Sequence, residues 1–304
     1  MKCYSQSVSK RESNVINEDA AIARNGIIAV SDGAGGGGVF AELWSNYLLS
    51  QLPARAIRDY QQLDAWVDGI WEPYYKDCEI KAKQQGSLFL NKFYDEGSFA
   101  TLAAVWFRNN TAEWMTYGDS VVFCYNFRHH KLQHSDISLA LFNQAPYLIG
   151  SNAALKAEGF HSGRFAMYDG EVFFAATDAL SHYILMMYEL AHAENYQEEI
   201  NEAVESKTKN SNLIKVAENE SIDFENTLCR LLYAACEKKR FILFMSRLEK
   251  SGLLAHDDYS LAVLDSRQTN VGRKTNGYVN KRAFIFRRGY KVMNLKTVRK
   301  MKHQ

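Results

Sequence analysis

Acidic side chains at the ends of strand-like segments are the residues of this sequence best suited to chemistry. They are Glu18, Asp19, Asp32, Asp119, Asp178 and either Asp257 or Asp258. These side chains offer only oxygen donors, a set that suits Mg²⁺ or Mn²⁺ better than Zn²⁺. Taken singly, each is better explained as a helix cap or a turn residue than as a metal ligand. Whether they form a metal site therefore depends on the secondary-structure elements that position them.

Asp32 stands between an apolar run and a glycine-rich stretch. Residues 27–31 are rich in β-branched side chains and predict a buried strand, residues 33–38 predict a tight turn, and a helix should follow. Glycine at this turn lets backbone approach closely. Residues 33–38 also match the dinucleotide pattern G-x-G-x-x-G. However, a neighbouring anion disfavours a pyrophosphate, and no Lys-Ser or Lys-Thr follows for a phosphate-binding loop.

A predicted hairpin brings two further acids to Asp32. Asn25-Gly26 between apolar runs is a strong hairpin signal, so residues 20–23 should pair with 27–31. Glu18 and Asp19 then lie level with Asp32 at one edge of a sheet. Three carboxylates together are costly unless a cation neutralises them.

The remaining elements follow from apolar spacing. Helical spacing covers residues 39–60, 63–85, the stretch after Asp178, and 224–250. Strands are predicted at 98–107, 111–117, 121–127 and 171–176, and a last one before residue 265. We expect 98–127 to form an antiparallel meander, which argues against a doubly wound nucleotide-binding fold.

Composition limits the class of protein. The 304 residues are 47% hydrophobic, contain no apolar run long enough to span a membrane and begin without a signal region, so we expect a soluble, cytoplasmic protein. The five cysteines show no disulfide or zinc spacing. Residues 266–304 hold 12 Lys or Arg and no acid, which leaves 24 basic against 35 acidic residues in 1–265. We predict a domain at 1–265 and a basic tail at 266–304.

Six motifs in this order resemble those of the protein phosphatase 2C family of metal-dependent serine/threonine phosphatases, in its bacterial type. The resemblance covers about residues 4–265. The motifs are Asn17-Glu18-Asp19-Ala20, Asp32-Gly33-x-Gly35-Gly36, Gly97-Ser98-x-Ala100-Thr101, Gly118-Asp119-Ser120, Thr177-Asp178-Ala179-Leu180 and Asp257-Asp258-Tyr259-Ser260-Leu261.

The resemblance implies an α+β fold, a four-layer α-β-β-α sandwich of two antiparallel sheets flanked by helices. It also implies a site for two Mn²⁺ or Mg²⁺ ions, with a third ion at Asp119. Asp32 would bridge two ions, with the Gly33 carbonyl, Asp178 and Asp257 on one and Glu18 and Asp19 on the other. Asp32 and Asp178 are the expected catalytic residues, and Lys10 or Arg11 would bind phosphate.

The chemistry agrees with this resemblance. Two ions about 3.5–4 Å apart can lower the pKa of a bridging water and align it for attack on phosphorus. No Cys or His is placed as a phosphoryl acceptor, so direct attack by water is expected. The implied substrate is a phosphoprotein in cytoplasmic signalling, either a kinase or a kinase target.

Departures from the family pattern keep an alternative open. Asn14 stands where many relatives carry Arg, Gly37 where His is frequent, and Ala179 where Gly is usual. The alternative is a catalytically weak or inactive pseudo-phosphatase that binds phosphoproteins as a regulatory module. For the basic tail we favour docking to the chain itself or to a protein partner over nucleic acid.

Overall fold

Strand β3 (Ile27–Ser31) is buried along its whole length in the computed structural model of the chain. Side chains alternate between the two faces of a strand. Ile28 and Val30 belong to the core between two sheets, whereas Ile27 and Ala29 belong to a core beneath helices. Both faces of this sheet are therefore covered. The structure describes residues 2–10, 15–24, 26–36, 38–108, 110–135, 137–220 and 222–267.

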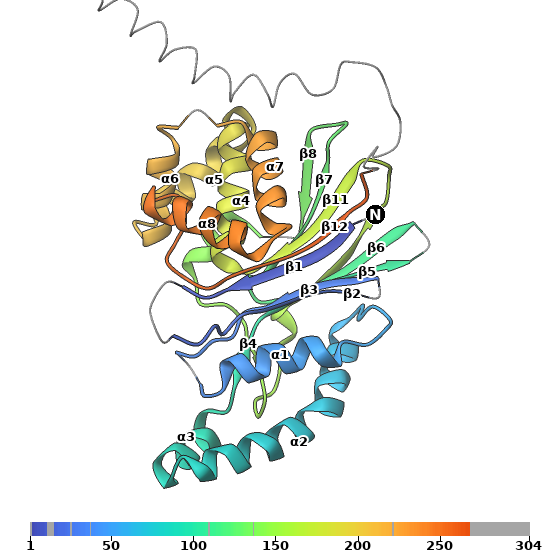
Figure 1. The fold of residues 1–304 in the computed structure, drawn as a ribbon, viewed down its shortest axis with the longest axis vertical. Helices are drawn as coiled ribbons and strands as arrows, with labels where there is room; N and C mark the ends of the chain where they lie inside the picture. The colour runs from blue at the N-terminus through green and yellow to red at the C-terminus, as the bar shows by residue number, and fades with distance from the viewer. Residues whose placement is uncertain are drawn as a thin grey trace, which may run out of the picture. The chain divides into compact units, whose positions relative to one another are not determined.

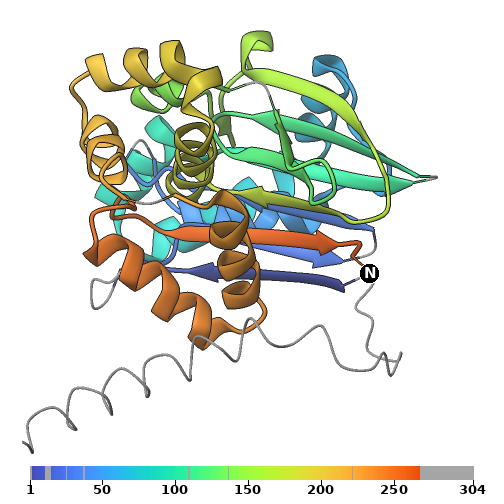
Figure 2. The same ribbon diagram turned by 90° about the horizontal axis from the view of Figure 1, so that it is seen from above.

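Within the described residues the strands form two larger antiparallel sheets and one short pair. The sheet that contains β3 has the order β10 (Phe160–Ala166), β6 (Thr111–Tyr117), β5 (Leu102–Arg108), β3, β2 (Ala20–Arg24). The other has the order β1 (Lys2–Val8), β12 (Tyr259–Asp265), β11 (Glu171–Ala176), β7 (Val121–Asn126), β8 (Lys131–His134). The short pair is β4 (Phe99–Ala100) with β9 (Ile149–Gly150). Figure 2 shows dark-blue β1 beside orange-red β12.

Helices cover the outer face of each sheet (Figure 1). On the sheet of β3 lie α1 (Ala41–Gln51), α2 (Tyr60–Gln84) and α3 (Ser87–Glu96). On the other sheet lie α4 (Asp178–Ala191), α5 (Ala193–Glu205), α6 (Lys209–Ala217), α7 (Phe224–Ala235) and α8 (Lys238–Lys250). Two 3₁₀ turns, η1 (Leu139–Asn143) and η2 (Ala157–Gly159), lie in the connections. The predicted α+β sandwich of four layers is confirmed.

The layer between the sheets is an apolar core. Phe173 in β11 is fully buried there, with its ring 5.3 Å from that of Phe107 and 6.4 Å from that of Phe165. Truncation of such a side chain to alanine costs about 3–5 kcal/mol. This core fixes how the two sheets face each other, and with it the strand ends that carry the acidic residues.

The predicted hairpin is confirmed, but the predicted meander is wrong in its second half. Ala20 pairs with Ser31 and Arg24 with Ile27, as the Asn-Gly signal indicates. β5 and β6 also pair with each other, but β7 pairs with β8 and β11 in the opposite sheet. The chain leaves the first sheet at Gly118, whose φ of 97° is open to glycine and strained for other residues.

The two longest predicted helices are shorter than their apolar patterns. The helix expected over 39–60 ends at Gln51, because Pro53 follows and the residue before a proline avoids helical geometry. The helix expected over 224–250 is two helices, α7 and α8. Leu228 and Leu232 would lie nearly opposite Phe241 and Met245 on one continuous helix. The break after Ala235 lets both faces reach the same core.

The predicted boundary between domain and tail lies next to the end of β12. That strand ends at Asp265, and residues Met1–Arg267 form one compact unit. The basic tail from residue 268 onward lies outside the described residues. In the part of the chain that is described, none of the helices combines the length and the apolar character needed to cross a membrane.

Candidate metal centre

Asp32 follows β3 directly and is fixed through Thr101, which separates β4 from β5. The Asp32 N–H donates to Thr101 Oγ1 at 3.2 Å, and the Thr101 N–H donates to the Asp32 carbonyl at 2.8 Å. The Ser31 hydroxyl adds a bond to the Thr101 carbonyl at 2.6 Å. These bonds occupy the backbone of Asp32 and leave its carboxylate to face the site.

Asp119 is tied to the same threonine. Thr101 Oγ1 and Ser120 Oγ lie 2.7 Å apart, which anchors the turn between β6 and β7 beside the end of β3. Asp119 Oδ1 is buried and has no hydrogen-bond partner among the described residues. A buried carboxylate oxygen without a partner is costly. An external ligand at this oxygen would relieve that cost.

Asp19 is held by the segment that carries Asp178. Thr177 Oγ1 donates to Asp19 Oδ2 at 2.8 Å and accepts from the Ser260 N–H at 3.0 Å. Thr177 precedes α4, so Asp178 is the first residue of that helix. One hydroxyl thus joins the start of β2, the start of α4 and the start of β12.

Glu18 lies against the glycine loop. A Cβ at Gly35 would lie 1.9 Å from Glu18 Oε1, and a Cβ at Gly33 would lie 2.6 Å from the Glu18 carbonyl and 2.7 Å from that of Ala41. Larger residues at 33 and 35 would force Glu18 and the loop apart. The Gly33 carbonyl, a predicted ligand, accepts the Gly35 N–H at 3.2 Å and keeps one lone pair.

Asp257 and Asp258 have different surroundings. The Asp258 carboxylate is buried and accepts the backbone N–H groups of Lys10 and Glu18, both at 2.7 Å. The Asp257 side chain is 45% exposed, with Lys10 Nζ 3.9 Å from its Oδ1. Asp258 therefore joins two chain segments, and Asp257 is the acid with oxygens available to a ligand.

The carboxylates act on one another strongly. Burial, followed by the charges of Asp19, Asp178, Asp119 and Asp257, raises the pKa of Asp32 well above its ordinary value. Burial likewise raises the pKa of Asp19 far above its ordinary value. The structure thus brings Asp19, Asp32, Asp119, Asp178 and Asp257 together from separate segments.

Three further carboxylates of the site also have raised pKa values. Burial, with the charge of Asp178 second, raises the pKa of Asp119 to about 8. Burial and the charge of Asp257 raise the pKa of Asp178 to about 6. Burial also raises the pKa of Glu18, which lies at the edge of the group and is opposed by the charge of Lys10. Each of these shifts is what a nearby cation would reverse.

Of the two predicted phosphate-binding residues, Lys10 lies at the site. Its Nζ lies 3.9 Å from Asp257 Oδ1, and its charge partly offsets the rise that burial causes in the pKa of Glu18. Arg11 lies outside the described residues. So do Asn14 and Gly37, the positions that depart from the family pattern.

The donor chemistry fits Mn²⁺ or Mg²⁺. The site offers a hard cation several carboxylates and the Gly33 carbonyl. One of the carboxylate oxygens, Asp119 Oδ1, has no hydrogen-bond partner among the described residues. As the side chains stand, no three or more His, Cys, Asp or Glu residues in the described part of the chain have the arrangement of a metal site. Closing the carboxylates onto an ion would therefore accompany binding.

Comparison with known proteins adds similarity of fold. No protein-family model and no curated protein matches the sequence. The catalytic domain of the serine/threonine protein phosphatase PstP, in complex with two manganese ions, is 14% identical over 87% of this chain and 97% of its own, with a TM-score of 0.48. PppA of Pseudomonas aeruginosa is 15% identical over 86% and 96%, with a TM-score of 0.46. Stp1, a serine/threonine phosphatase from Staphylococcus aureus, is 13% identical over 87% and 95%, with a TM-score of 0.45.

The likeness is one of fold. All three TM-scores lie below 0.5, so the function is inferred below from the residues of this chain.

Hydroxyl side chains are the part of the site that sequence reasoning missed. Thr101, Ser120 and Thr177 lie inside the quoted motifs, but their bonding partners could not be predicted from spacing. Ser7 gives no sequence signal, yet its hydroxyl donates to the Asp19 carbonyl at 3.1 Å and lies 2.8 Å from Ser260 Oγ. These residues position the acids.

Proposed function

We propose that this chain is a metal-dependent protein serine/threonine phosphatase of the phosphatase 2C type. The observation that supports it most is the convergence of buried acids whose pKa values are raised, with Lys10 as a basic side chain beside them. A protein that gathers like charges in this way needs a cation to offset the cost of desolvation. Phosphoryl transfer needs that same positive charge.

The residues proposed to hold the ions follow the sequence motifs. Asp32 would contact both ions, with the Gly33 carbonyl, Asp178 and Asp257 on one and Glu18 and Asp19 on the other; Asp119 would contact a third. The bound ions would supply charge that acidifies a water molecule and offsets negative charge on the phosphoryl oxygens. Thr101 and Thr177 keep Asp32 and Asp19 in place through the bonds described above.

The proposed substrate is a phosphoserine or phosphothreonine protein of the cytoplasm, a kinase or a target of one. Lys10 lies at the rim of the acidic group, with its Nζ near the half-exposed Asp257. An ammonium group there can contact a phosphate as a mobile point charge. It would not hold the phosphate in the bidentate manner of an arginine.

The test is hydrolysis of para-nitrophenyl phosphate and of a phosphothreonine peptide with Mn²⁺ added. The wild type should turn over both, and Asp32→Asn and Asp178→Asn should lose both activities. Glu113→Gln, which changes a buried acid near the end of β6 opposite to Asp119, is the matched control and should keep both. Turnover that persists without divalent metal in the presence of a chelator would contradict the proposal.

A second candidate is a pseudo-phosphatase that binds phosphoproteins without turnover. Asn14 in place of the usual arginine is the observation that favours it. The same assay separates the two functions, because a pseudo-phosphatase would bind Mn²⁺ and a phosphopeptide while hydrolysing neither substrate.

A further inference from the structure

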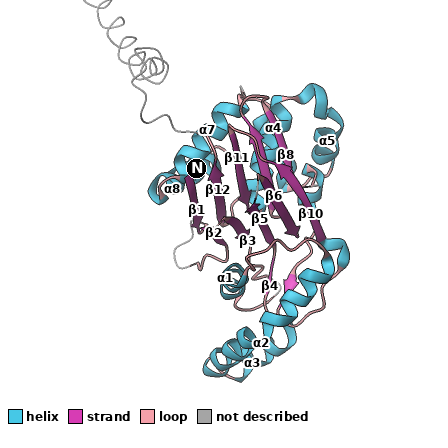
Figure 3. Cartoon of the chain, turned by 90° about the vertical axis from the view of Figure 1, so that its right-hand side faces the viewer, coloured by secondary structure: helices cyan, strands magenta, loops and turns pink. Residues whose placement is uncertain are grey.

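A groove of about 800 Å³ lies between α2, α3 and residues 150–154. Figure 3 shows that α2 and α3 extend away from the strands, so the groove is on the outer part of the helical layer. Aromatic and acidic side chains alternate along the face of α2 that lines the groove, and α3 adds one more ring. The residues used below are the aromatic Trp71, Tyr75 and Tyr94 and the acidic Asp68, Glu72 and Glu79.

The aromatic side chains of the groove are held in place by ring contacts. Trp71 and Tyr75 meet edge to face with centroids 5.7 Å apart, and Tyr75 lies 4.7 Å from Phe93. Phe93 is fully buried, and its ring is 6.1 Å from that of Tyr94. Tyr94 remains 41% exposed, and its hydroxyl donates to Glu79 Oε1. The rings are therefore ordered before a ligand arrives, which reduces the entropy lost on binding.

The carboxylates of the groove are only partly neutralised. Glu72 pairs with Lys76 at 2.6 Å, and Glu79 pairs with Lys83 at 3.2 Å. Asp68 is exposed and forms no ion pair with any residue that the structure describes. A carboxylate next to aromatic faces favours a planar cation, because a guanidinium can stack on the rings and pair with the acid.

The floor of the groove is bonded to the segment that supports the Asp32 loop. Ser151 donates its N–H to the Ser98 carbonyl at 2.9 Å and accepts the Ser98 N–H on its hydroxyl at 3.0 Å. Phe99, the next residue, accepts the Ala34 N–H at 2.9 Å, two residues beyond Asp32. Residues 98–99 thus bond both to the segment that lines the groove and to the loop that follows Asp32.

We propose that this groove docks an arginine-containing segment of the phosphoprotein substrate, an inference that rests on the proposed phosphatase function. The guanidinium stacks on Trp71 and Tyr75 and pairs with Asp68. The groove thereby selects phosphoproteins with a basic segment near the phosphorylated residue, while the candidate metal centre acts on the phosphate whatever surrounds it.

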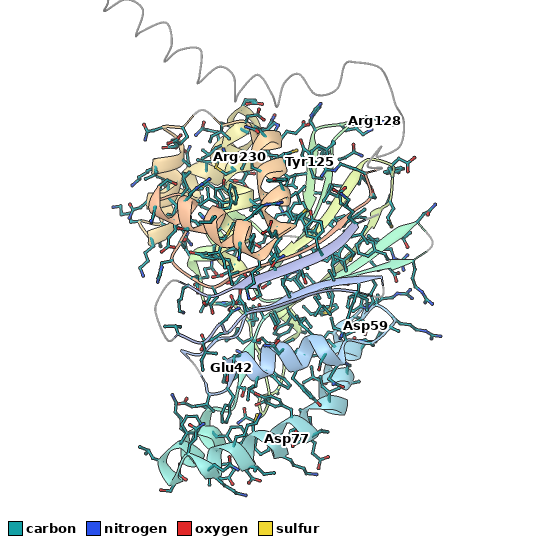
Figure 4. All side chains as sticks on the ribbon, viewed as in Figure 1. Glu42, Asp59, Asp77, Tyr125, Arg128 and Arg230 are labelled. Carbon is teal, nitrogen blue, oxygen red and sulfur yellow. The ribbon has the colours of Figure 1, made fainter. Side chains whose placement is uncertain are left out.

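The test compares Asp68→Lys with Asp77→Lys. Asp77 is exposed on α2 (Figure 4) and lies nine residues from Asp68, two and a half helical turns, so it points away from the groove. Binding of an unphosphorylated arginine-rich peptide is titrated by tryptophan fluorescence at physiological salt, where charges on the far face are screened. Asp68→Lys should weaken binding at least about fivefold, and Asp77→Lys should leave it unchanged.

Activity gives the second measurement. The kcat/KM for an arginine-containing phosphothreonine peptide should fall in Asp68→Lys, and turnover of para-nitrophenyl phosphate, which is too small to span both sites, should not change. Equal binding by the two lysine variants, or binding of a glutamine-substituted peptide as tight as that of the arginine peptide, would overturn the docking proposal. Absence of para-nitrophenyl phosphate turnover in the wild type would instead overturn the phosphatase proposal, because peptide binding is measured without turnover.

Discussion

The two ends of β6 show how differently this fold treats a buried acid. Near one end, Glu113 is 8% exposed and meets Arg58 Nη2 at 3.0 Å and Arg164 Nη2 at 2.9 Å. The hydrogen bond from Arg58 is the main reason that the pKa of Glu113 lies below its ordinary value. Beyond the other end, Asp119 keeps an oxygen without a partner, and burial raises its pKa to about 8.

The difference shows that this chain can neutralise a buried carboxylate with its own arginines. It does so at Glu113, which lies in β6 between β10 and β5. At the candidate metal centre it places further acids around Asp119 instead. Buried carboxylates with strongly raised pKa values cluster at functional sites. The oxygen donors around Asp119 favour a bound divalent cation as that function.

The largest expected effect is on turnover, which should depend on the acids of the candidate metal centre and not on Glu113 at the other end of β6. Asp32→Asn should lower Mn²⁺-dependent turnover more than about a hundredfold, since even residues that only support metal ligands contribute 10- to 100-fold. Glu113→Gln should leave turnover within about twofold of the wild type, because its partners lie outside the site. Steady-state assays with para-nitrophenyl phosphate measure both. Similar losses of turnover in Asp32→Asn and Glu113→Gln would contradict the proposed difference between the two ends of β6.

Bound metal should stabilise the folded protein through the acids of the candidate metal centre and not through Glu113. Mn²⁺ at a hundred times its Kd would add about 2.7 kcal/mol to the free energy of unfolding, or roughly 5–10 °C in Tm. Asp178→Asn should abolish this shift, and Glu113→Gln should retain it. Differential scanning fluorimetry with and without Mn²⁺ gives the result. A wild type whose Tm does not respond to Mn²⁺ would be evidence against the ion site.

A smaller effect is expected from the hydroxyl that positions Asp19. Thr177→Val removes the donor to Asp19 and the acceptor for the Ser260 N–H, so Mn²⁺ affinity should fall about 10- to 100-fold. Thr177→Ser keeps the hydroxyl and should stay near the wild type. Mn²⁺ titrations of activity distinguish the variants. If valine is tolerated as well as serine, Thr177 does not position the site.

The smallest effect concerns pH in the metal-free protein. The folded pKa of Asp119 is raised, so its contribution to stability is present below its ordinary pKa of 3.8 and is lost as pH rises to about 8. The folded pKa of Glu113 is lowered, so its contribution is present above its ordinary pKa of 4.5 and is lost on acidification. Asp119→Asn should therefore gain stability over the wild type at alkaline pH.

Glu113→Gln should lose about 1 kcal/mol at neutral pH and converge on the wild type in acid, because both arginines stay solvated after the change. Urea unfolding across the pH range measures both variants. Parallel pH profiles for the two variants would contradict the comparison.

The local parts of this site were predictable from the sequence. The Asn-Gly hairpin signal depends on neighbouring residues, and it correctly predicted that 20–23 pair with 27–31, a ladder that the structure extends to Arg24. That pairing already brings Asp19 level with Asp32. Acids that directly follow or precede apolar strands, such as Asp178, could also be placed from spacing alone.

The remainder depends on contacts between distant segments. Nothing in residues 257–258 shows which acid accepts the Lys10 and Glu18 N–H groups, because those donors come from the other end of the chain. The crossing from β6 to β7 was missed because a turn at Gly118 looks alike whether the next strand pairs in the same sheet or the facing one. The groove beside Trp71 could not be predicted, since the spacing of aromatic residues does not show which helix faces remain exposed.

The central claim is that the acids around Asp32 bind divalent metal, and direct Mn²⁺ titration by calorimetry tests it best. We expect binding of about two ions in the wild type and in Glu113→Gln, with loss of this binding in Asp32→Asn. Binding in Asp32→Asn equal to that of the wild type, or no binding in the wild type, would contradict the account.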